Sequence, residues 1–386
     1  MEQIIILFKY KYCILLFLLL SLIDIITKNK LESFYKEIAK YIQYNLENNL
    51  NHTSSEFYKR ENPIISIVIS TFNGEIYLKP AIRSIQNQKF LDIEIIVVND
   101  GSMDNTVKVV NELMEEDRRI KLLSNTINRG TLFTKSKGVL NAKGEYVMTL
   151  DHDNLYSTEY VFSRLYEESK KFNLDLLGFS GISTGIKIKN IHKSDFLNYI
   201  SSGVIKKPYI KKRFLSFDKS IESTTNLCLY FIRTEIFSKT IKQLGDEFIN
   251  RNIDAHDDSI LVFILARNAQ TLKHLKEIFY IILIWPEKYS ESLSFQRGTK
   301  KRERERKNCY SYLTFSEILL KFTDRRDKFI AEKNFLYWFI REKKCKNKTE
   351  IKNDAIRICN LYLTDKYIPL KTKKEISLYL NQIQQK

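Results

Sequence analysis

The sequence predicts an α/β protein, built on a mostly parallel β-sheet with helices on both faces. Short apolar, β-branched runs alternate with helical patterns between residues 64 and 153. The runs are nearly continuous in apolar residues, which is typical of strands buried on both faces. Alternation of this kind favours a Rossmann-like, doubly covered sheet. Ligands of such sheets bind beyond the carboxyl ends of the strands, so polar residues at those ends are the first candidates for a site.

The elements of this stretch follow one another with short breaks. Strands are expected at residues 64–70, 93–98, 120–123 and 145–150. Apolar residues at three- and four-residue spacing mark two helices, through Leu78, Ala81, Ile82, Ile85, Val107, Val110, Leu113 and Met114. A third helix is expected at residues 131–140. Later elements are a helix at 157–171, strands at 174–180 and 277–286, and a helical or strand–helix segment at 227–241.

Polar side chains follow three of the predicted strands where each one ends. Thr71 and Asn73 follow the first strand, Asn99 and Asp100 the second, and Asp151 and Asp153 the fourth. Since the carboxyl ends of parallel strands meet at one edge of a sheet, these groups are expected to surround one crevice.

Four motifs in order resemble the N-terminal half of a family 2 glycosyltransferase with the GT-A fold. They are ISIVISTFN, IIVVNDGSMDNT, NRGTLFTKSKGVLNAKGEYV and the Asp-x-Asp motif DHD. The resemblance covers roughly residues 63–290 and is strongest over 63–155. It implies transfer of a sugar from a nucleotide-diphosphate sugar, with a UDP-sugar favoured as donor, and a divalent metal as cofactor. The order of the motifs is specific, whereas an Asp-x-Asp alone is common in a charged chain.

The resemblance also implies a role for each matching residue. Asp153 would be the metal ligand, and Asp151 would contact the ribose or the metal, directly or through water. Hard oxygen ligands of this kind suit Mg²⁺ or Mn²⁺. His152 is expected to be a packed or solvent-facing spacer.

The donor pocket would be formed by the first two motifs and by one lysine. Asp100 would hold the nucleobase, Thr71 and Asn73 would line its pocket, and Phe72 would back it. Lys135 stands where many relatives carry arginine, and it would meet the diphosphate as a point charge rather than as a bidentate donor. Each residue also has a plainer explanation, since Asp100 is suited to cap a turn with Gly101 and Thr71 to end a strand.

Asp257 and Asp258 open an apolar helical run, ILVFILARNA. The segment resembles the Glu-Asp motif of the family, with Asp257 where Glu is usual. Asp258, with Asp257 as the near alternative, would be the general base on the acceptor hydroxyl. The resemblance implies single displacement with inversion at the anomeric carbon. Carboxylates at a helix N-terminus are also ordinary capping residues.

The N-terminal segment carries an apolar core over Tyr12–Ile23, shorter than the roughly 20 residues that a spanning helix prefers. We expect a short cytosolic tail and a signal-anchor helix over residues 1–27, with a cleaved signal peptide or a buried helix as alternatives. Residues 28–62 would form a stem, 63–299 the GT-A domain and 300–386 a helical extension. This arrangement predicts a single-pass type II protein of the Golgi or endoplasmic reticulum with a lumenal catalytic domain, or else a secreted protein.

Composition limits the other functions. The formal net charge is +17, carried by lysines scattered along the chain, so it favours a general compositional bias over a dedicated basic surface. No nucleic-acid-binding motif is present, and we expect no nucleic-acid partner. The expected partners are a nucleotide-sugar donor, a glycan, lipid-linked or protein acceptor, and a membrane through the N-terminal helix. Two alternatives stay open: a nucleotidylyltransferase, and a catalytically degenerate relative that binds nucleotide sugar or serves as a scaffold.

Overall fold

The computed structural model describes residues 37, 40–47, 50, 61–185, 196–197, 203–210, 225–284, 299–328, 331–332 and 352–384. The predicted signal-anchor at residues 1–27 lies outside the described residues, as does most of the predicted stem at 28–62. Within the described part of the chain, no helix has the length and apolar character needed to cross a membrane.

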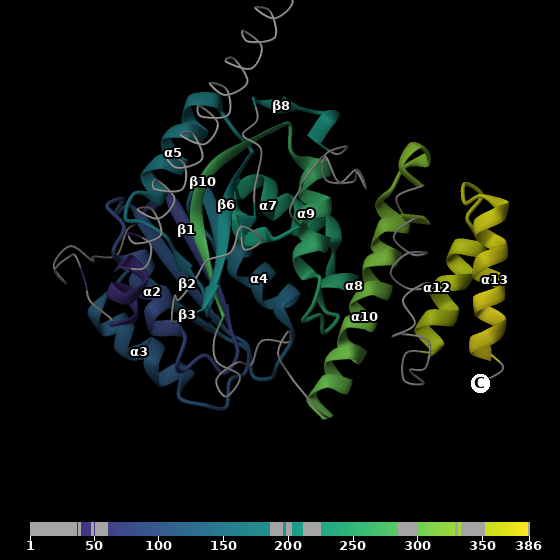
Figure 1. Cartoon of the computed structure of the whole chain (residues 1–386), viewed down its shortest axis with the longest axis horizontal. Helices are drawn as coiled ribbons and strands as arrows, with labels where there is room; N and C mark the ends of the chain where they lie inside the picture. The colour runs from purple at the N-terminus through teal and green to yellow at the C-terminus, as the bar shows by residue number, and fades with distance from the viewer. Residues whose placement is uncertain are drawn as a thin grey trace, which may run out of the picture.

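The first half of the chain forms the alternating sheet that the sequence predicts (Figure 1). Its strands are β1 (Ile65–Thr71), β2 (Ile93–Asn99), β3 (Ile120–Ser124) and β4 (Tyr146–Asp151). Its helices are α2 (Leu78–Gln86), α3 (Thr106–Glu116) and α4 (Thr131–Leu140). β1 lies between β2 and β4 and pairs with both in parallel, and β3 pairs in parallel with β2.

The second half extends the same sheet, but with mixed strand directions. It contains β5 (Leu155–Tyr156), α5 (Val161–Phe172), β6 (Leu176–Gly185), β7 (Phe196–Leu197), β8 (Ile205–Lys206), β9 (Tyr230–Arg233) and β10 (Thr271–Ile284). The strand order is β3-β2-β1-β4-β9-β6-β10-β5. β9 runs antiparallel to both β4 and β6, while β10 runs parallel to β6. The expected mostly parallel sheet is therefore correct for β1–β4 and too simple beyond them.

Every residue of β1 is buried, Ser66 and Ser70 included, so the strand is covered on both faces. Ile65, Ile67 and Ile69 face the cluster formed with α2, α3 and α5. Val68 faces the opposite cluster, which includes Leu132 and Val139 of α4. α4 packs closely on this face because it has no side chain at Gly138, where an added Cβ would lie 2.3 Å from Val68 Cγ1.

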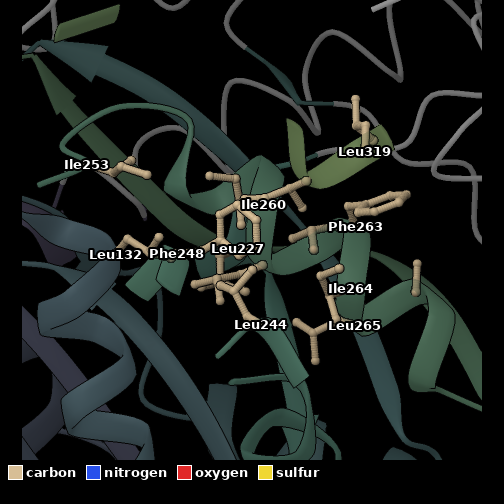
Figure 2. Packing of buried hydrophobic residues seen from close by; sticks show 14 of the residues in the cluster. Leu132, Leu227, Leu244, Phe248, Ile253, Ile260, Phe263, Ile264, Leu265 and Leu319 are labelled. Atoms are coloured by element: carbon tan, nitrogen blue, oxygen red, sulfur yellow. The ribbon is translucent and has the colours of Figure 1, made fainter. Parts of the chain in front are cut away.

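The remaining helices pack, in one hydrophobic cluster, on the side of the sheet that α4 covers. They are α7 (Thr234–Leu244), α8 (Asp246–Ile249), α9 (Asp257–Asn268), α10 (Thr299–Phe322), α12 (Lys352–Thr364) and α13 (Leu370–Gln384). In Figure 1, α10, α12 and α13 lie beyond α9, on the side away from the sheet. One hydrophobic cluster joins them to the sheet domain, and Figure 2 shows part of it, including Leu132 of α4, Ile260 and Phe263 of α9 and Leu319 of α10. The described parts of the expected C-terminal segment, 300–386, are largely helical, and they share a core with the sheet domain.

Candidate active site

The three predicted polar clusters lie at one edge of the sheet. The register pairs Thr71 of β1 with Asn99 of β2, and Ser70 of β1 with Asp151 of β4. The carboxyl ends of three neighbouring strands therefore carry polar groups side by side, as the parallel pattern requires.

The loops after β1 and β2 are tied together by hydrogen bonds. The Asp100 amide donates to the Thr71 carbonyl at 2.8 Å. The Asn73 amide donates to Ser102 Oγ at 2.9 Å, and the Met103 amide donates to Asn73 Oδ1 at 3.0 Å. Asn73 has a φ of 50°, a left-handed conformation that asparagine tolerates better than most residues. Phe72 is half-buried beside it. These bonds hold the predicted nucleobase pocket in one conformation.

Asp100 is almost fully buried and holds the chain that enters α4. Its Oδ1 accepts from the Arg129 amide at 2.9 Å and from Asn125 Nδ2 at 2.8 Å. Its Oδ2 accepts from the Gly130 amide at 2.9 Å. A carboxylate offers about four acceptor positions, so Asp100 keeps capacity for a further donor. Its structural role is thus evident, and its contact with a nucleobase stays a prediction.

Lys135 lies at the centre of a buried ion-pair cluster, which is the main feature of the site. Its Nζ is 2.7 Å from Asp258 Oδ1, 3.0 Å from Asp257 Oδ2 and 3.5 Å from Asp151 Oδ1. The lysine comes from α4, Asp151 from the end of β4, and the other two carboxylates from the first turn of α9. The structure therefore brings together four of the predicted residues from three separate elements.

The protonation of this cluster follows from burial and from one shared cation. Burial acts to lower the pKa of Lys135, but Asp257, Asp258 and Asp151 outweigh it and raise that pKa well above its usual range. Burial acts to raise the pKa of Asp257, but Lys135 outweighs it and the pKa is lowered. For Asp258 burial prevails over the attraction of Lys135, and its pKa rises to about 7. Unequal environments thus separate two neighbouring carboxyl groups.

Asp153 and His152 occupy the loop that follows β4. Burial raises the pKa of Asp153, against the opposing effect of His152. His152 Nδ1 lies 3.2 Å from the Ser70 carbonyl oxygen, and its ring is 5.5 Å from that of Tyr77. This packing agrees with the expectation that His152 is a spacer.

Three groups that the sequence did not single out contact the site. Tyr280 of β10 places its Oη 3.4 Å from Asp151 Oδ2, and Asn154 Nδ2 donates to the same Oη at 3.1 Å. The Leu227 amide donates to Asp258 Oδ2 at 3.2 Å. Tyr280 belongs to an apolar strand and Leu227 acts through its backbone, so neither carries a signal in the sequence.

The donor set suits a hard divalent cation that is shared with a substrate. Asp151 keeps 36% of its side chain exposed at the carboxyl end of β4. Around Lys135, three carboxylates face one ammonium, so the cluster favours additional positive charge. Among the described residues, no group of three or more His, Cys, Asp or Glu side chains is arranged to hold a metal ion by itself. Mg²⁺ typically uses one or two carboxylates together with substrate phosphates and water, which Asp151 and Asp153 are able to provide.

Residues 66–236 match the sequence model of the family described as "Glycosyl transferase family 2". The match covers β1 through the start of α7 and includes the Asp-x-Asp segment. It ends before Asp257 and Asp258, so the carboxylates of α9 are joined to the matched region by the Lys135 ion pairs.

Curated relatives resemble the chain over part of its length. A GalNAc(5)-diNAcBac-PP-undecaprenol beta-1,3-glucosyltransferase of Campylobacter jejuni is 44% identical over 93 residues, which are 24% of this chain and 30% of the relative. An uncharacterized glycosyltransferase, EpsJ of Bacillus subtilis, is 28% identical over 224 residues, or 57% and 60% of the two chains. An uncharacterized glycosyltransferase of Haemophilus influenzae is 33% identical over 103 residues, which are 27% of this chain and 41% of the relative.

A solved structure shares the fold over most of the chain. The S. aureus protein TarS, residues 1–349, in complex with UDP-GlcNAc aligns with a TM-score of 0.57 at 15% sequence identity. The alignment covers 83% of this chain and 90% of that one. At this identity the likeness shows the fold alone, and it confirms the expected GT-A architecture.

Proposed function

We propose that this chain is a glycosyltransferase of family 2, whose sequence model residues 66–236 match, and that it moves a sugar from a nucleotide-diphosphate sugar to an acceptor hydroxyl. One observation carries the proposal. Lys135 binds the candidate base Asp258 at 2.7 Å and lies 3.5 Å from Asp151 of the Asp-x-Asp motif. A group that would remove a proton and a group that would face a diphosphate thus border the same crevice.

Asp258 is the proposed general base. A base is most effective when its pKa lies near the working pH, and the pKa of Asp258 is raised to about 7 by burial. The Leu227 amide and Lys135 each hold one of its oxygens, so the carboxylate is fixed in direction. We propose that it accepts the proton of the acceptor hydroxyl as that oxygen attacks the anomeric carbon. As the resemblance to the family implies, the transfer is proposed to be a single displacement with inversion at the anomeric carbon.

The donor is proposed to lie over the carboxyl ends of β1, β2 and β4. Asp100, Thr71, Phe72 and Asn73 would hold the nucleobase at the loops that their hydrogen bonds fix. Thr71 Oγ1 supports this assignment because it is buried without a hydrogen-bond partner in the described structure. A UDP-sugar is favoured, and the UDP-GlcNAc complex of TarS agrees with that choice.

Asp151 and Asp153 are proposed to hold a divalent ion, Mn²⁺ or Mg²⁺, together with the donor. Such an ion, when bound, neutralises the charge of the diphosphate leaving group. Tyr280 would orient Asp151 through its hydroxyl, which in turn accepts a hydrogen bond from Asn154 Nδ2. Lys135 lies within ion-pair distance of both Asp151 and Asp258, and its contact with the diphosphate stays a prediction.

The acceptor is proposed to be a glycan, a lipid-linked sugar or a glycoprotein. The Campylobacter jejuni relative acts on an undecaprenol-linked glycan, as its name states, which supports the lipid-linked choice. The matched segment spans 30% of that relative and 24% of this chain.

A nucleotide-sugar turnover assay on the full chain tests the proposal. UDP- and GDP-sugars are screened with Mn²⁺, with and without chelator, and the Asp153→Ala variant is measured in parallel. We expect turnover of one donor that the chelator abolishes and that Asp153→Ala lowers at least about 100-fold, because the diphosphate loses its counter-charge. If a folded wild-type protein neither turns over nor binds any donor in the presence of metal, the enzymatic function is refuted and a scaffold role follows.

A further inference from the structure

We propose that Tyr312 of α10 is a positioning residue, which sets the candidate base Asp258 in place by stacking on His256. This inference rests on the function proposed above, and it gives the C-terminal helices a part in that function. The contacts of three residues in the loop before α9 carry it.

His256 holds an unfavourable backbone conformation directly before the two carboxylates. Its φ is 59°, in the left-handed region that residues other than glycine rarely adopt. Its carbonyl accepts the first hydrogen bond of α9, from the Ile260 amide at 3.1 Å. Such a conformation persists only where the surroundings determine it. Since His256 directs the chain into α9, its conformation decides where Asp257 and Asp258 point.

The surroundings that determine it come from α10. The rings of His256 and Tyr312 are 4.0 Å apart between centroids and are inclined by 31°, a close, tilted contact that we call the stack. Tyr312 is more than fifty residues away in sequence, on a helix whose other apolar side chains pack against α9. The stack therefore joins the loop to a separate, packed element.

Two more contacts tie the same loop to the same helix. Asp254 forms an ion pair with Lys307, and Arg251 binds Glu317 at 2.7 Å. Residues 251, 254 and 256 thus each contact α10, at positions spread along about three turns of that helix. The loop is fixed along its length, and its last contact is adjacent to the carboxylates.

Correct placement of a general base is expected to matter for the chemical step and less for donor binding. A displacement of about 1 Å can reduce a rate about 100-fold. The residues proposed to bind the donor lie on β1, β2 and β4 or on the loops that follow them, and none lies on the loop that Tyr312 contacts. Loss of the stack is therefore expected to lower kcat while the KM for the donor changes little.

The first experiment compares tyrosine variants of the full chain. We expect Tyr312→Ala to lower kcat about 10- to 100-fold with the donor KM within about 2-fold, because the backbone that carries the base is no longer fixed by the stack. Tyr312→Phe keeps the ring and is expected to retain at least half of the wild-type kcat. Tyr310→Ala is the matched control: the same residue type lies on the same helix, about 200° around its axis, and kcat should stay within about 2-fold. Thermal melting confirms that each variant is folded, and Tyr312→Leu replaces Tyr312→Ala if the latter is not.

A double-mutant cycle with His256→Gly separates positioning from general destabilisation. Glycine accepts the left-handed φ but has no ring, so Tyr312 has nothing to stack on. In that background Tyr312→Ala should change kcat by less than about 2-fold. The inference is overturned if Tyr312→Ala keeps the wild-type kcat, if Tyr310→Ala loses as much, or if the loss persists in the His256→Gly background. Wild-type protein without turnover would refute the proposed function, and this inference with it.

Discussion

Lys135 is the residue on which the site depends most. Its side chain is 5% exposed, and its ammonium faces three carboxylates, of which two belong to one helical turn. Without this cation, Asp257 and Asp258 would be two like charges buried together, an arrangement that forces one of them to bind a proton. Lys135 therefore sets the pH range in which Asp258 is able to act as a base.

Replacement of Lys135 by methionine is expected to move the pH dependence of kcat. In the wild type, activity should rise with pH through about 7, where Asp258 loses its proton. Lys135 attracts the ionised form, so its removal raises the pKa of Asp258, and the midpoint should shift upward by about 1–3 pH units. Lys135→Arg keeps the positive charge and should shift the midpoint of the pH dependence by less. A midpoint that is unchanged in Lys135→Met would show that Asp258 does not control the rate.

Residue identity at this site could be predicted only in part from the sequence. The polar groups after β1, β2 and β4 were predicted to share one edge, and the strand register confirms it. The pairing of Lys135 with Asp258 was not predicted, because the two are 123 positions apart and meet only when α9 packs beside α4. The contribution of Tyr280 was missed for the same reason.

Among the elements, α10 connects the loop before α9 to the last two helices. Its Glu317 accepts two bonds from Arg357 of α12, at 2.7 and 2.8 Å, and one from Arg251 at 2.7 Å. Burial acts to raise the pKa of Glu317, but the two arginines outweigh it and lower that pKa to about 2. One carboxylate thus links three segments of the chain.

This carboxylate is expected to make stability depend on pH. A carboxyl with a lowered pKa stabilises the folded state above its unfolded pKa, near 4.3, and this stability is lost as the pH falls toward about 2. Because Arg357 is 44% exposed, solvent weakens the ion pair, and we expect the lowered pKa of Glu317 to contribute roughly 1–3 kcal/mol to the free energy of unfolding at pH 7. Glu317→Gln should lower the Tm at pH 7 and flatten its fall between pH 5 and pH 2.

The matched control for this prediction is Glu159→Gln. Glu159 lies 3.6 Å from Lys89, whose side chain is 49% exposed, so the pair should contribute little. Equal Tm values for Glu317→Gln and the wild type across this pH range would contradict the importance of the Glu317 cluster.

At the scale of the whole molecule, the sequence predicted the helices and strands that form within a short segment, and it missed the pairing and packing between segments far apart in the chain. The alternation from β1 to β4 was predicted because each strand and helix carries its own hydrophobic period. The antiparallel insertion of β9 between β4 and β6 was not predicted, since four residues carry no signal for strand direction. The C-terminal helices were expected, but their shared core with α9 appears only in the structure.

The central claim for the molecule is that Asp258 removes the proton of an acceptor in a nucleotide-sugar transferase. The most direct test measures kcat and donor affinity for the wild type and for Asp258→Asn, with the donor identified by the turnover screen. We predict a kcat lower by about 10²–10⁴-fold, since a general base contributes that much, and a donor Kd within about 3-fold. An Asp258→Asn protein that turns over as fast as the wild type would contradict the claim.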